Sequence, residues 1–295
     1  MTYNTMTGFW QLLSDGKIGS EKSNGKSSTS ERHPYQVAFY YQINGKSYFY
    51  AHSTDTLKWY IKELSDNGKI GEETASGARE NPYHVAFPFQ IGGQTYYYAQ
   101  NVDSNYWYIQ ELVEGGQLGE ETDQGQWLNA YHVAFLFTIN GRTFLYGHNI
   151  DSNYWFIQEL MEGGKIGEET ANGTWQNAQH VSFPYQIKDK HYLYMHNTTN
   201  RCWWITELFS DGTIGQETAR GSWKSTFQVA IPFQINEKVY YYAHNIHTKH
   251  WYIQELTQNG KMGSKTANGT WRNSYPVIFA AKIKNKSYIY AQCFE

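Results

Sequence analysis

Cysteine is scarce in this sequence. Only two cysteines, Cys202 and Cys293, occur among 295 residues. A secreted fold held by a disulfide framework needs many more, so such a fold is excluded and a reducing or redox-indifferent compartment is favoured. The N-terminal segment also lacks the apolar core and the small-residue cleavage site of a signal peptide. We therefore expect the protein to be cytoplasmic, or secreted by a route that uses no signal peptide.

Charge of one sign, long apolar runs and helical periodicity are also lacking. The 24 Lys and Arg residues nearly balance the 27 Asp and Glu residues, which gives a formal net charge of −3. Nucleic-acid binding needs a basic surface, so nucleic acid is not a predicted partner. No apolar run is long enough for a membrane span. Apolar residues nowhere recur at helical spacing over the length of a helix.

The motifs of common catalytic sites are missing as well. The chain has no G-x-S-x-G nucleophile elbow, no P-loop, no dinucleotide fingerprint and no HExxH zinc motif. Carboxylates are plentiful, so a pair of the kind that glycosidases use could be brought together by folding alone. No cofactor is predicted.

What the sequence has instead is a long repeat. The segment from Tyr83 to Trp127 is written again, with few changes, from Tyr131 to Trp175. One valine marks the same point in each copy, 48 residues (85 − 37) after the last: Val37, Val85, Val133, Val181, Val229 and Val277. A constant period of this length is typical of one supersecondary unit stacked against copies of itself.

Each copy is predicted to contain four strands. Aromatic and β-branched residues fill the strands, while Gly, Asn, Asp and Ser fall between them. In the copy that begins at Tyr83, the strands are predicted at His84–Ile91, Thr95–Gln100, Trp107–Leu112 and Leu118–Thr122, with tight turns at Gly92-Gly93 and Gly115-Gly116 and a loop from Asp123 to Tyr131. A four-stranded sheet that recurs every 40 to 50 residues or so is the blade of a β-propeller.

The two ends of the chain complement each other. Residues 1–22 match the third and fourth strands of a copy, and residues 276–293 match the first and second strands. Five whole copies lie between them, at about 33–270. The sequence therefore predicts an all-β, six-bladed β-propeller of four-stranded antiparallel blades. Residues 1–295 are expected to form one domain, and the N- and C-terminal strands are expected to close the last blade, which leaves no exposed sheet edge.

The loops predicted at one end of the blades carry the most distinctive side chains. Tryptophan follows the fourth strand in four copies, and arginine takes its place in the first whole copy. The loop between the second and third strands is rich in Asn and Asp in the two most similar copies. The candidate ligand-binding residues are Trp127, Trp175, Trp223, Trp271, Arg79, Asn101, Asp103, Asn105, Asn149, Asp151 and Asn153.

This set of side chains suits a carbohydrate ligand. An aromatic ring can pack on the C–H face of a sugar while amides and carboxylates bind its hydroxyls, and repetition of weak sites adds avidity. The best sites are predicted in the segments 101–127 and 149–175. The alternative is that the tryptophans pack between blades and that the asparagine loops are turns that satisfy their own backbone. The tryptophans that open the third strands are predicted to be core residues: Trp59, Trp107, Trp155, Trp203 and Trp251.

Histidine recurs at two positions of the repeat. His84, His132 and His180 open the first strand in three consecutive copies, and first strands line the axis of a propeller. Three imidazoles at the mouth of a central channel could bind zinc or iron. The alternative is that they only form hydrogen bonds within the loops, as glutamine could do in other copies. A second series ends the second strands: His52, His148, His196 and His244.

The period, the aromatic loops and the near-identical repetition resemble β-propeller lectins, such as the tachylectin-2, tectonin and fungal fucose-lectin groups. In architecture the resemblance covers the whole chain. It implies a multivalent carbohydrate-binding protein whose partners are glycans or glycoconjugates and whose pockets are not catalytic. Two other interpretations stay open. One is an enzyme with a single active site at the histidine-lined mouth of the central channel, and the other is a protein-interaction scaffold.

Overall fold

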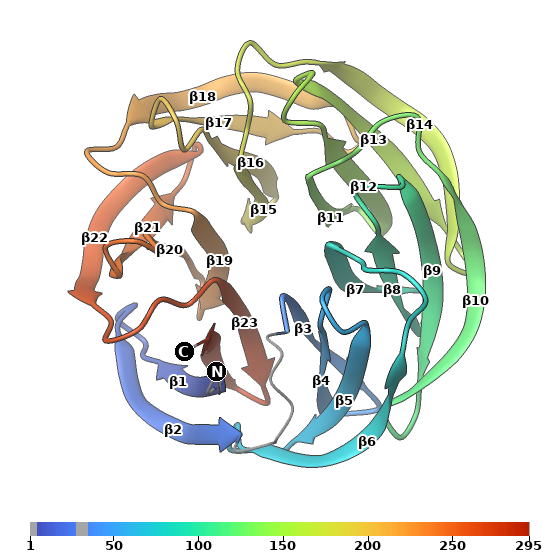
Figure 1. Ribbon diagram of the computed structural model, residues 1–295. Coiled ribbons are helices and arrows are strands. Elements are labelled where there is room, and N and C mark those ends of the chain that lie inside the picture. Colours follow the sequence, from blue (N-terminus) through green and yellow to red (C-terminus); the bar gives the residue numbers. More distant parts are fainter. Residues whose placement is uncertain (1–4, 28–34, 295) are drawn as a thin grey trace. The chain divides into compact units, whose positions relative to one another are not determined.

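The structure, a computed structural model, describes residues 5–27 and 35–294. In these ranges the strands form six antiparallel sheets of four strands each (Figure 1). The fold is an all-β, six-bladed propeller, as the sequence predicts. The predicted boundaries at residues 1 and 33 lie outside the described residues. Within the described residues, no helix is long and apolar enough to cross a membrane.

The chain divides into two compact units of three blades each. The first unit contains Lys17–Trp127 and the two ends of the chain, up to Leu13 and from Arg272. The second unit contains Leu128–Trp271 and Ser14–Gly16. The expectation of one domain over residues 1–295 stays a prediction.

The first unit holds the closing blade, blade 1 and blade 2. The closing blade has the sheet order β2-β1-β24-β23 and comprises β1 (Thr5–Leu12), β2 (Ile18–Ser27), β23 (Val277–Ile283) and β24 (Lys286–Phe294). Blade 1 comprises β3 (Val37–Ile43), β4 (Lys46–His52), β5 (Lys58–Leu64) and β6 (Ile70–Ala78). Blade 2 comprises β7 (Val85–Ile91), β8 (Gln94–Gln100), β9 (Tyr106–Val113) and β10 (Gln117–Gln126). Phe9 of β1 pairs with Tyr290 of β24, so the N- and C-terminal strands share one sheet, as predicted (Figure 1).

The second unit holds blades 3, 4 and 5. Blade 3 comprises β11 (Val133–Ile139), β12 (Arg142–His148), β13 (Tyr154–Met161) and β14 (Lys165–Thr174). Blade 4 comprises β15 (Val181–Ile187), β16 (Lys190–His196), β17 (Cys202–Leu208) and β18 (Ile214–Ser222). Blade 5 comprises β19 (Val229–Ile235), β20 (Lys238–His244), β21 (His250–Thr257) and β22 (Lys261–Thr270).

The fourth strands are longer than the sequence predicts. In blade 2 the register between β9 and β10 shifts on either side of Glu121, which marks a β-bulge. Beyond the bulge, pairing continues as far as Gln126, opposite Tyr106. The predicted strand end at Thr122 is therefore wrong, because a bulge absorbs an extra residue and the polar segment after it stays in the ladder.

Aromatic side chains fill the space between neighbouring blades. Tyr96, Tyr97 and Tyr98 of β8 are all buried, although their side chains alternate between the two faces of the sheet. The ring of Tyr97 lies 5.4 Å from that of Tyr50 in blade 1. Both faces of the sheet are therefore covered, and burial of each such side chain contributes roughly 1.5–3 kcal/mol.

First strands of adjacent blades lie next to one another inside each unit. In the first unit β3 contacts both β7 and β23, and in the second unit β15 contacts both β11 and β19. The residues just before these strands consequently gather at the same end of the unit. This end also carries the loops between second and third strands, and we call it the loop end. The opposite end carries the tight hairpin turns, and we call it the turn end.

Candidate functional site

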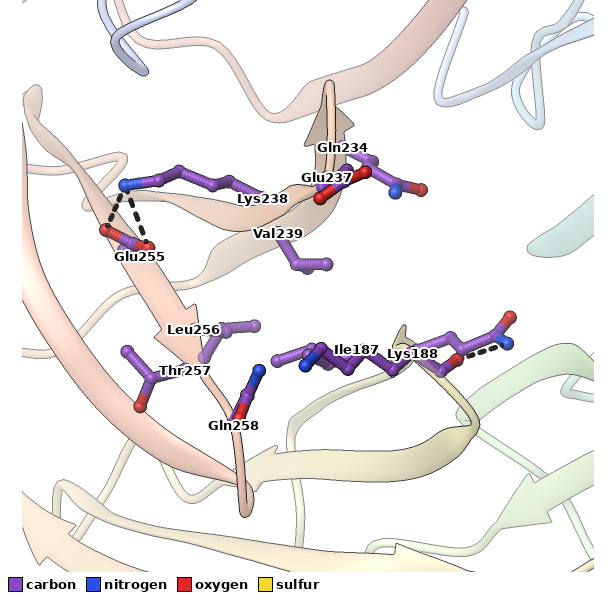
Figure 2. A pocket seen from close by; sticks show the side chains of 11 residues that line it. Ile187, Lys188, Gln234, Glu237, Lys238, Val239, Glu255, Leu256, Thr257 and Gln258 are labelled. Atoms are coloured by element: carbon purple, nitrogen blue, oxygen red, sulfur yellow. Dashed lines mark hydrogen bonds and ion pairs between the residues drawn. The ribbon is translucent and has the colours of Figure 1, made fainter.

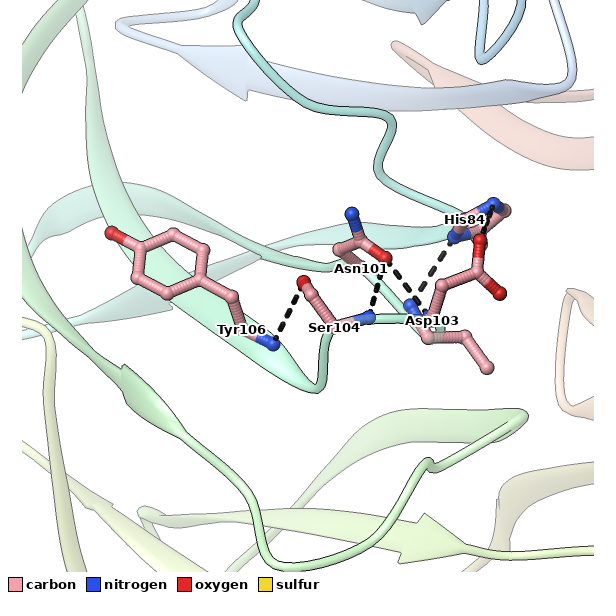
Figure 3. Close-up of polar contacts among 6 residues, drawn as sticks. His84, Asn101, Asp103, Ser104 and Tyr106 are labelled. Atoms are coloured by element: carbon pink, nitrogen blue, oxygen red, sulfur yellow. Dashed lines mark hydrogen bonds and ion pairs between the residues drawn. The ribbon is translucent and has the colours of Figure 1, made fainter.

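An asparagine shapes the loop between the second and third strands. In blade 2, Oδ1 of Asn101 accepts hydrogen bonds from the backbone N–H groups of Asp103, at 2.9 Å, and Ser104, at 3.1 Å (Figure 3). Asn101 is buried, so its side chain is engaged by the loop's own backbone. Asn105 then turns the chain with a φ of 60°, a conformation that asparagine tolerates better than most residues.

Blade 3 repeats this loop. Oδ1 of Asn149 accepts hydrogen bonds from the N–H groups of Asp151 and Ser152, both at 2.8 Å, and Asn153 has a φ of 60°. The carbonyl oxygen of Asn153 accepts the backbone N–H of Trp175 at 3.0 Å. The four predicted asparagine ligands thus hold the loop structure, which leaves the aspartates as the loop's exposed carboxylates.

His84 closes over the loop of blade 2. Its Nδ1 accepts the backbone N–H of Val102 at 3.2 Å, so the proton of the neutral imidazole is on Nε2 (Figure 3). Nε2 lies 3.7 Å from Oδ2 of Asp103. This separation is longer than a hydrogen bond. The two side chains are 33% and 82% exposed, so a bound molecule could contact both.

Blade 3 contains a second copy of this pair. Nδ1 of His132 accepts the N–H of Ile150 at 3.4 Å, and Nε2 lies 3.7 Å from Oδ2 of Asp151. One His–Asp pair therefore lies wholly in the first unit and one wholly in the second. Neither histidine is hydrogen-bonded to a serine, threonine or cysteine side chain among the described residues.

In blades 1, 4 and 5 the side chain at the position of His84 also accepts a backbone N–H of the loop, but no His–Asp pair is present. In blade 1, Gln36 takes the position of the histidine, and its Oε1 accepts the N–H of Thr54 at 2.8 Å. In blade 5, Oε1 of Gln228 accepts the N–H of Ile246 at 3.1 Å. His180 of blade 4 caps Thr198 at 3.2 Å but has Thr199 where blades 2 and 3 have aspartate. Burial lowers the pKa of His180. We call His84, His132 and His180 the capping histidines.

The second series of histidines is enclosed by protein. His52, His148, His196 and His244, here called the buried histidines, are at most 1% exposed. Nε2 of His148 accepts the N–H of Gln179 at 3.1 Å, so its proton is on Nδ1, 3.1 Å from the carbonyl oxygen of Tyr154. His196 has the opposite tautomer, because its Nε2 lies 2.6 Å from the carbonyl oxygen of Phe227 and must donate.

The four tryptophans predicted to bind ligand are engaged in packing within their blades. The indole N–H of each donates to the hydroxyl of a buried second-strand tyrosine, at 2.7–3.1 Å. Each ring also stacks on the tryptophan that opens the third strand, with centroids 5.2–5.7 Å apart. The pairs are Trp127 on Trp107, Trp175 on Trp155, Trp223 on Trp203, and Trp271 on Trp251.

Arg79 replaces the tryptophan in blade 1 and points into the space between blades 1 and 2. Its Nη2 donates to Oε1 of Gln110 at 2.9 Å and to the hydroxyl of Tyr97. Its guanidinium lies 5.4 Å from the ring centroid of Trp59 and 5.3 Å from that of Tyr108. Arg79 therefore serves as a cationic substitute for the indole in packing.

The turn end of the second unit contains a cavity of about 810 Å³ (Figure 2). Ile187, Val239 and Leu256 form its apolar wall. Two of its charged groups form an ion pair, in which Nζ of Lys238 lies 3.2 Å from Oε1 of Glu255 (Figure 2).

No metal centre is found at the histidines. Across the described residues, His, Cys, Asp and Glu side chains form no group of three or more that could hold a metal ion. The alternative of a zinc or iron site at His84, His132 and His180 therefore gains no support.

Three solved structures of similar fold are described as lactonases. No family model and no curated protein matches the chain. A provisionally assigned 6-phosphogluconolactonase from Bacteroides fragilis has a TM-score of 0.59 at 9% identity over 94% of this chain and 85% of its own. A similar Bacteroides uniformis protein has a TM-score of 0.59 at 11% identity (94% and 86%). The periplasmic gluconolactonase of Pseudomonas aeruginosa has a TM-score of 0.55 at 10% identity (92% and 97%). At these identities the likeness shows the fold.

The prediction of a multivalent lectin is wrong. Three solved structures of similar fold are described as lactonases, so the resemblance to β-propeller lectins is not supported. The aromatic loop residues suggested a sugar-binding site, but packing within the blades also places tryptophan at a fixed position of the repeat. The indoles of Trp127, Trp175, Trp223 and Trp271 are half-buried and hydrogen-bonded to tyrosines, and their role as ligand contacts stays a prediction.

Sequence reasoning singled out both members of the His–Asp pairs but did not join them. The signal was present in the repeat, because His84 and Asp103 are 19 residues apart, as are His132 and Asp151. The two positions do not vary together, because blade 1 has Gln36 with Asp55 and blade 4 has His180 with Thr199. The constant spacing is therefore the only signal of the contact in the sequence.

Proposed function

We propose that this chain is a hydrolase that opens a cyclic ester with a His–Asp pair at the loop end, in which the aspartate transfers the proton and the histidine stabilises the carbonyl oxygen. The observation that carries the proposal is the geometry of His84 with Asp103 and of its copy, His132 with Asp151. In each pair an exposed carboxylate faces an imidazole whose outward nitrogen carries the proton. The description of similar propellers as gluconolactonases supports a lactone as the substrate class.

The proposed reaction uses water as the nucleophile. The Asp103 carboxylate takes a proton from a water molecule. At the same time the water oxygen forms a bond to the lactone carbonyl carbon. Nε2–H of His84 donates a hydrogen bond to the carbonyl oxygen and stabilises the negative charge that develops there. The Asp103 carboxyl group then gives its proton to the ring oxygen as the C–O bond breaks, which restores the carboxylate, and the product is a hydroxy acid. General acid–base catalysis of this kind typically contributes about 10²–10⁴-fold, which is useful for an ester that also hydrolyses without a catalyst.

The proposal is tested with glucono-δ-lactone as the probe. Hydrolysis is followed as acid release in a pH-stat near neutral pH, with the spontaneous rate subtracted. Asp103→Asn or Asp151→Asn removes the base of one pair. We expect the hydrolysis rate of a catalytically active pair to fall about 100-fold, and the total catalysed rate to fall by the same factor in the double variant.

Blade 1 offers the matched control. Asp55 holds the same loop position but accepts a hydrogen bond from Nε2 of Gln36 at 3.0 Å, so the side chain opposite it is not free to stabilise a carbonyl oxygen. Asp55→Asn should therefore leave the rate unchanged. A folded wild-type chain that hydrolyses neither glucono-δ-lactone nor γ-butyrolactone above the spontaneous rate would refute the proposal, as would a double variant with undiminished activity.

A further inference from the structure

Blade 4 lacks an aromatic ring that all the other blades have. The residue two positions before the first strand is Tyr35, Tyr83, Tyr131, Phe227 or Tyr275 in the other five. In blade 2 the ring of Tyr83 packs edge-on against Tyr108 of β9, with centroids 4.8 Å apart. Blades 1, 3 and 5 show the same packing. Blade 4 has Gln179 at this position, so no such ring covers Trp204 of β17.

A second substitution in blade 4 removes more volume beside the first. The middle of the third strand carries a glutamine in blades 2, 3 and 5. Its amide donates to the carbonyl oxygen of a bulge glycine at 2.8–3.2 Å: Gln110 to Gly119, Gln158 to Gly167, and Gln254 to Gly263. Blade 4 has Thr206 there, and the shorter hydroxyl side chain reaches no hydrogen-bond partner.

The two substitutions leave a cavity of about 340 Å³ within the second unit. Its walls include Trp175 and Met195 as well as Trp204 and Ile214, and Gln179 and Thr206 are among its polar lining residues. Its charged lining residues, Glu217 and Arg220, form an ion pair with Oε1 and Nε 2.6 Å apart.

Both polar side chains are buried and end in an unpaired atom. Gln179 is 3% exposed and Thr206 is 5% exposed. Gln179 is held in place because its backbone N–H is bonded to His148 and its Nε2 donates to the carbonyl oxygen of Asn177 at 2.8 Å. Its Oε1 and the Thr206 hydroxyl have no partner. Each unpaired buried group costs about 1–3 kcal/mol, which a ligand with matching groups would recover.

We infer that this cavity of blade 4 binds a small, uncharged cyclic amide. The volume lies at the lower end of the range for ligand sites, about 300–1,000 Å³, which limits the ligand to one or two rings. Two indoles among the walls favour a planar ring. A ring N–H would donate to Oε1 of Gln179, and the adjoining carbonyl oxygen would accept from the Thr206 hydroxyl. The ion pair of Glu217 with Arg220 leaves no lining charge in need of a counter-charge.

The experiment titrates the full chain with 2-pyridone, a cyclic amide, and follows binding by calorimetry and by ligand-observed NMR. We expect one saturable site. Gln179→Tyr introduces the residue found at positions 83 and 131 and fills the cavity, so it should abolish binding. Gln179→Leu keeps most of the space but removes the acceptor, so it should weaken binding about tenfold, as loss of roughly 1.4 kcal/mol would.

Control variants distinguish binding at this cavity from non-specific binding of an aromatic ligand. Phe227→Tyr makes the corresponding exchange in blade 5 and should leave the affinity unchanged. Thr206→Gln introduces the residue of blades 2, 3 and 5 and should weaken binding, which provides a second variant if Gln179→Tyr fails to fold. Absence of saturable 2-pyridone binding to the wild type, equal binding of benzoate, or undiminished binding to both filled variants would overturn the inference.

Discussion

The capping and buried histidines occupy neighbouring places in the repeat, yet the protein uses them in opposite ways. His84 and His132 keep one ring nitrogen on a backbone N–H and turn the protonated nitrogen toward an exposed carboxylate. His148 and His196 have both ring nitrogens engaged by groups inside the protein. The same side chain is therefore available for chemistry at one position and serves only to connect structural elements at the other. What separates the two uses is exposure and the identity of the partner.

The largest difference between the capping and the buried histidines should be their effect on stability at acidic pH. Burial, the largest cause, lowers the pKa of His52, His148 and His196 to about 4, from an ordinary value of 6.5; the positive charge of Arg79 adds to the effect at His52. Between these values the unfolded state binds more protons than the folded state. The free energy of unfolding should therefore be greatest above pH 6.5 and fall as the pH drops toward 4, by about 1–3 kcal/mol per histidine. Urea unfolding at pH 7 and pH 4.5 measures this loss.

Glutamine variants isolate the contribution of these histidines from that of the carboxylates. Gln100 and Gln292 hold the same repeat position, and their Oε1 atoms accept a tyrosine hydroxyl at 2.9 and 3.0 Å. The triple variant His52→Gln, His148→Gln, His196→Gln should fold and should lose less stability between pH 7 and pH 4.5 than the wild type. An unchanged pH dependence would mean that these histidines do not titrate differently in the folded and unfolded states.

The architecture could be predicted from the sequence because it follows from local composition repeated at a constant period. The valine series gives the number of blades, and the complementary chain ends identify the closing blade. The end of β10 could not be predicted, because the bulge at Glu121 lets polar residues remain in the ladder as far as Gln126. The sequence pattern contains no marker for such a bulge.

The second largest effect on stability should come from a tyrosine that connects one of the buried histidines to a tryptophan. The hydroxyl of Tyr194 accepts the indole N–H of Trp223 at 3.1 Å and lies 3.1 Å from Nδ1 of His196. Tyr146 accepts Trp175 at 2.9 Å and has no hydrogen bond to His148. Tyr194→Phe leaves two groups unpaired and Tyr146→Phe leaves one.

We therefore expect Tyr194→Phe to cost about 1–3 kcal/mol more than Tyr146→Phe in urea unfolding at pH 7. Equal costs would show that the contact of Tyr194 with His196 adds nothing to stability. The two variants are well matched because both tyrosines are buried and each substitution removes only a hydroxyl group.

The candidate site was harder to predict than the fold because its contacts join residues that are distant in the chain. His84 meets Asp103 only because Asn101 folds the loop back over the start of β7. The cavity of blade 4 was visible in the sequence as two breaks in the repeat, Gln179 and Thr206. Their consequence depends on the packing of Trp175 and Trp204 around them, which no pattern of single residues describes.

The smallest effect should come from a capping histidine. His84→Ala removes the acceptor of the Val102 N–H in a partly exposed loop, so the expected cost is only about 0.5–1.5 kcal/mol in urea unfolding. His84→Gln should restore most of this stability, because Gln36 and Gln228 accept the equivalent N–H at 2.8 and 3.1 Å. The same variant removes the imidazole that stabilises the carbonyl oxygen in the proposed blade 2 reaction. Stability restored together with lost hydrolysis at the blade 2 pair would separate the cap from the chemistry, whereas a glutamine variant as unstable as the alanine variant would show that the imidazole is needed for the loop itself.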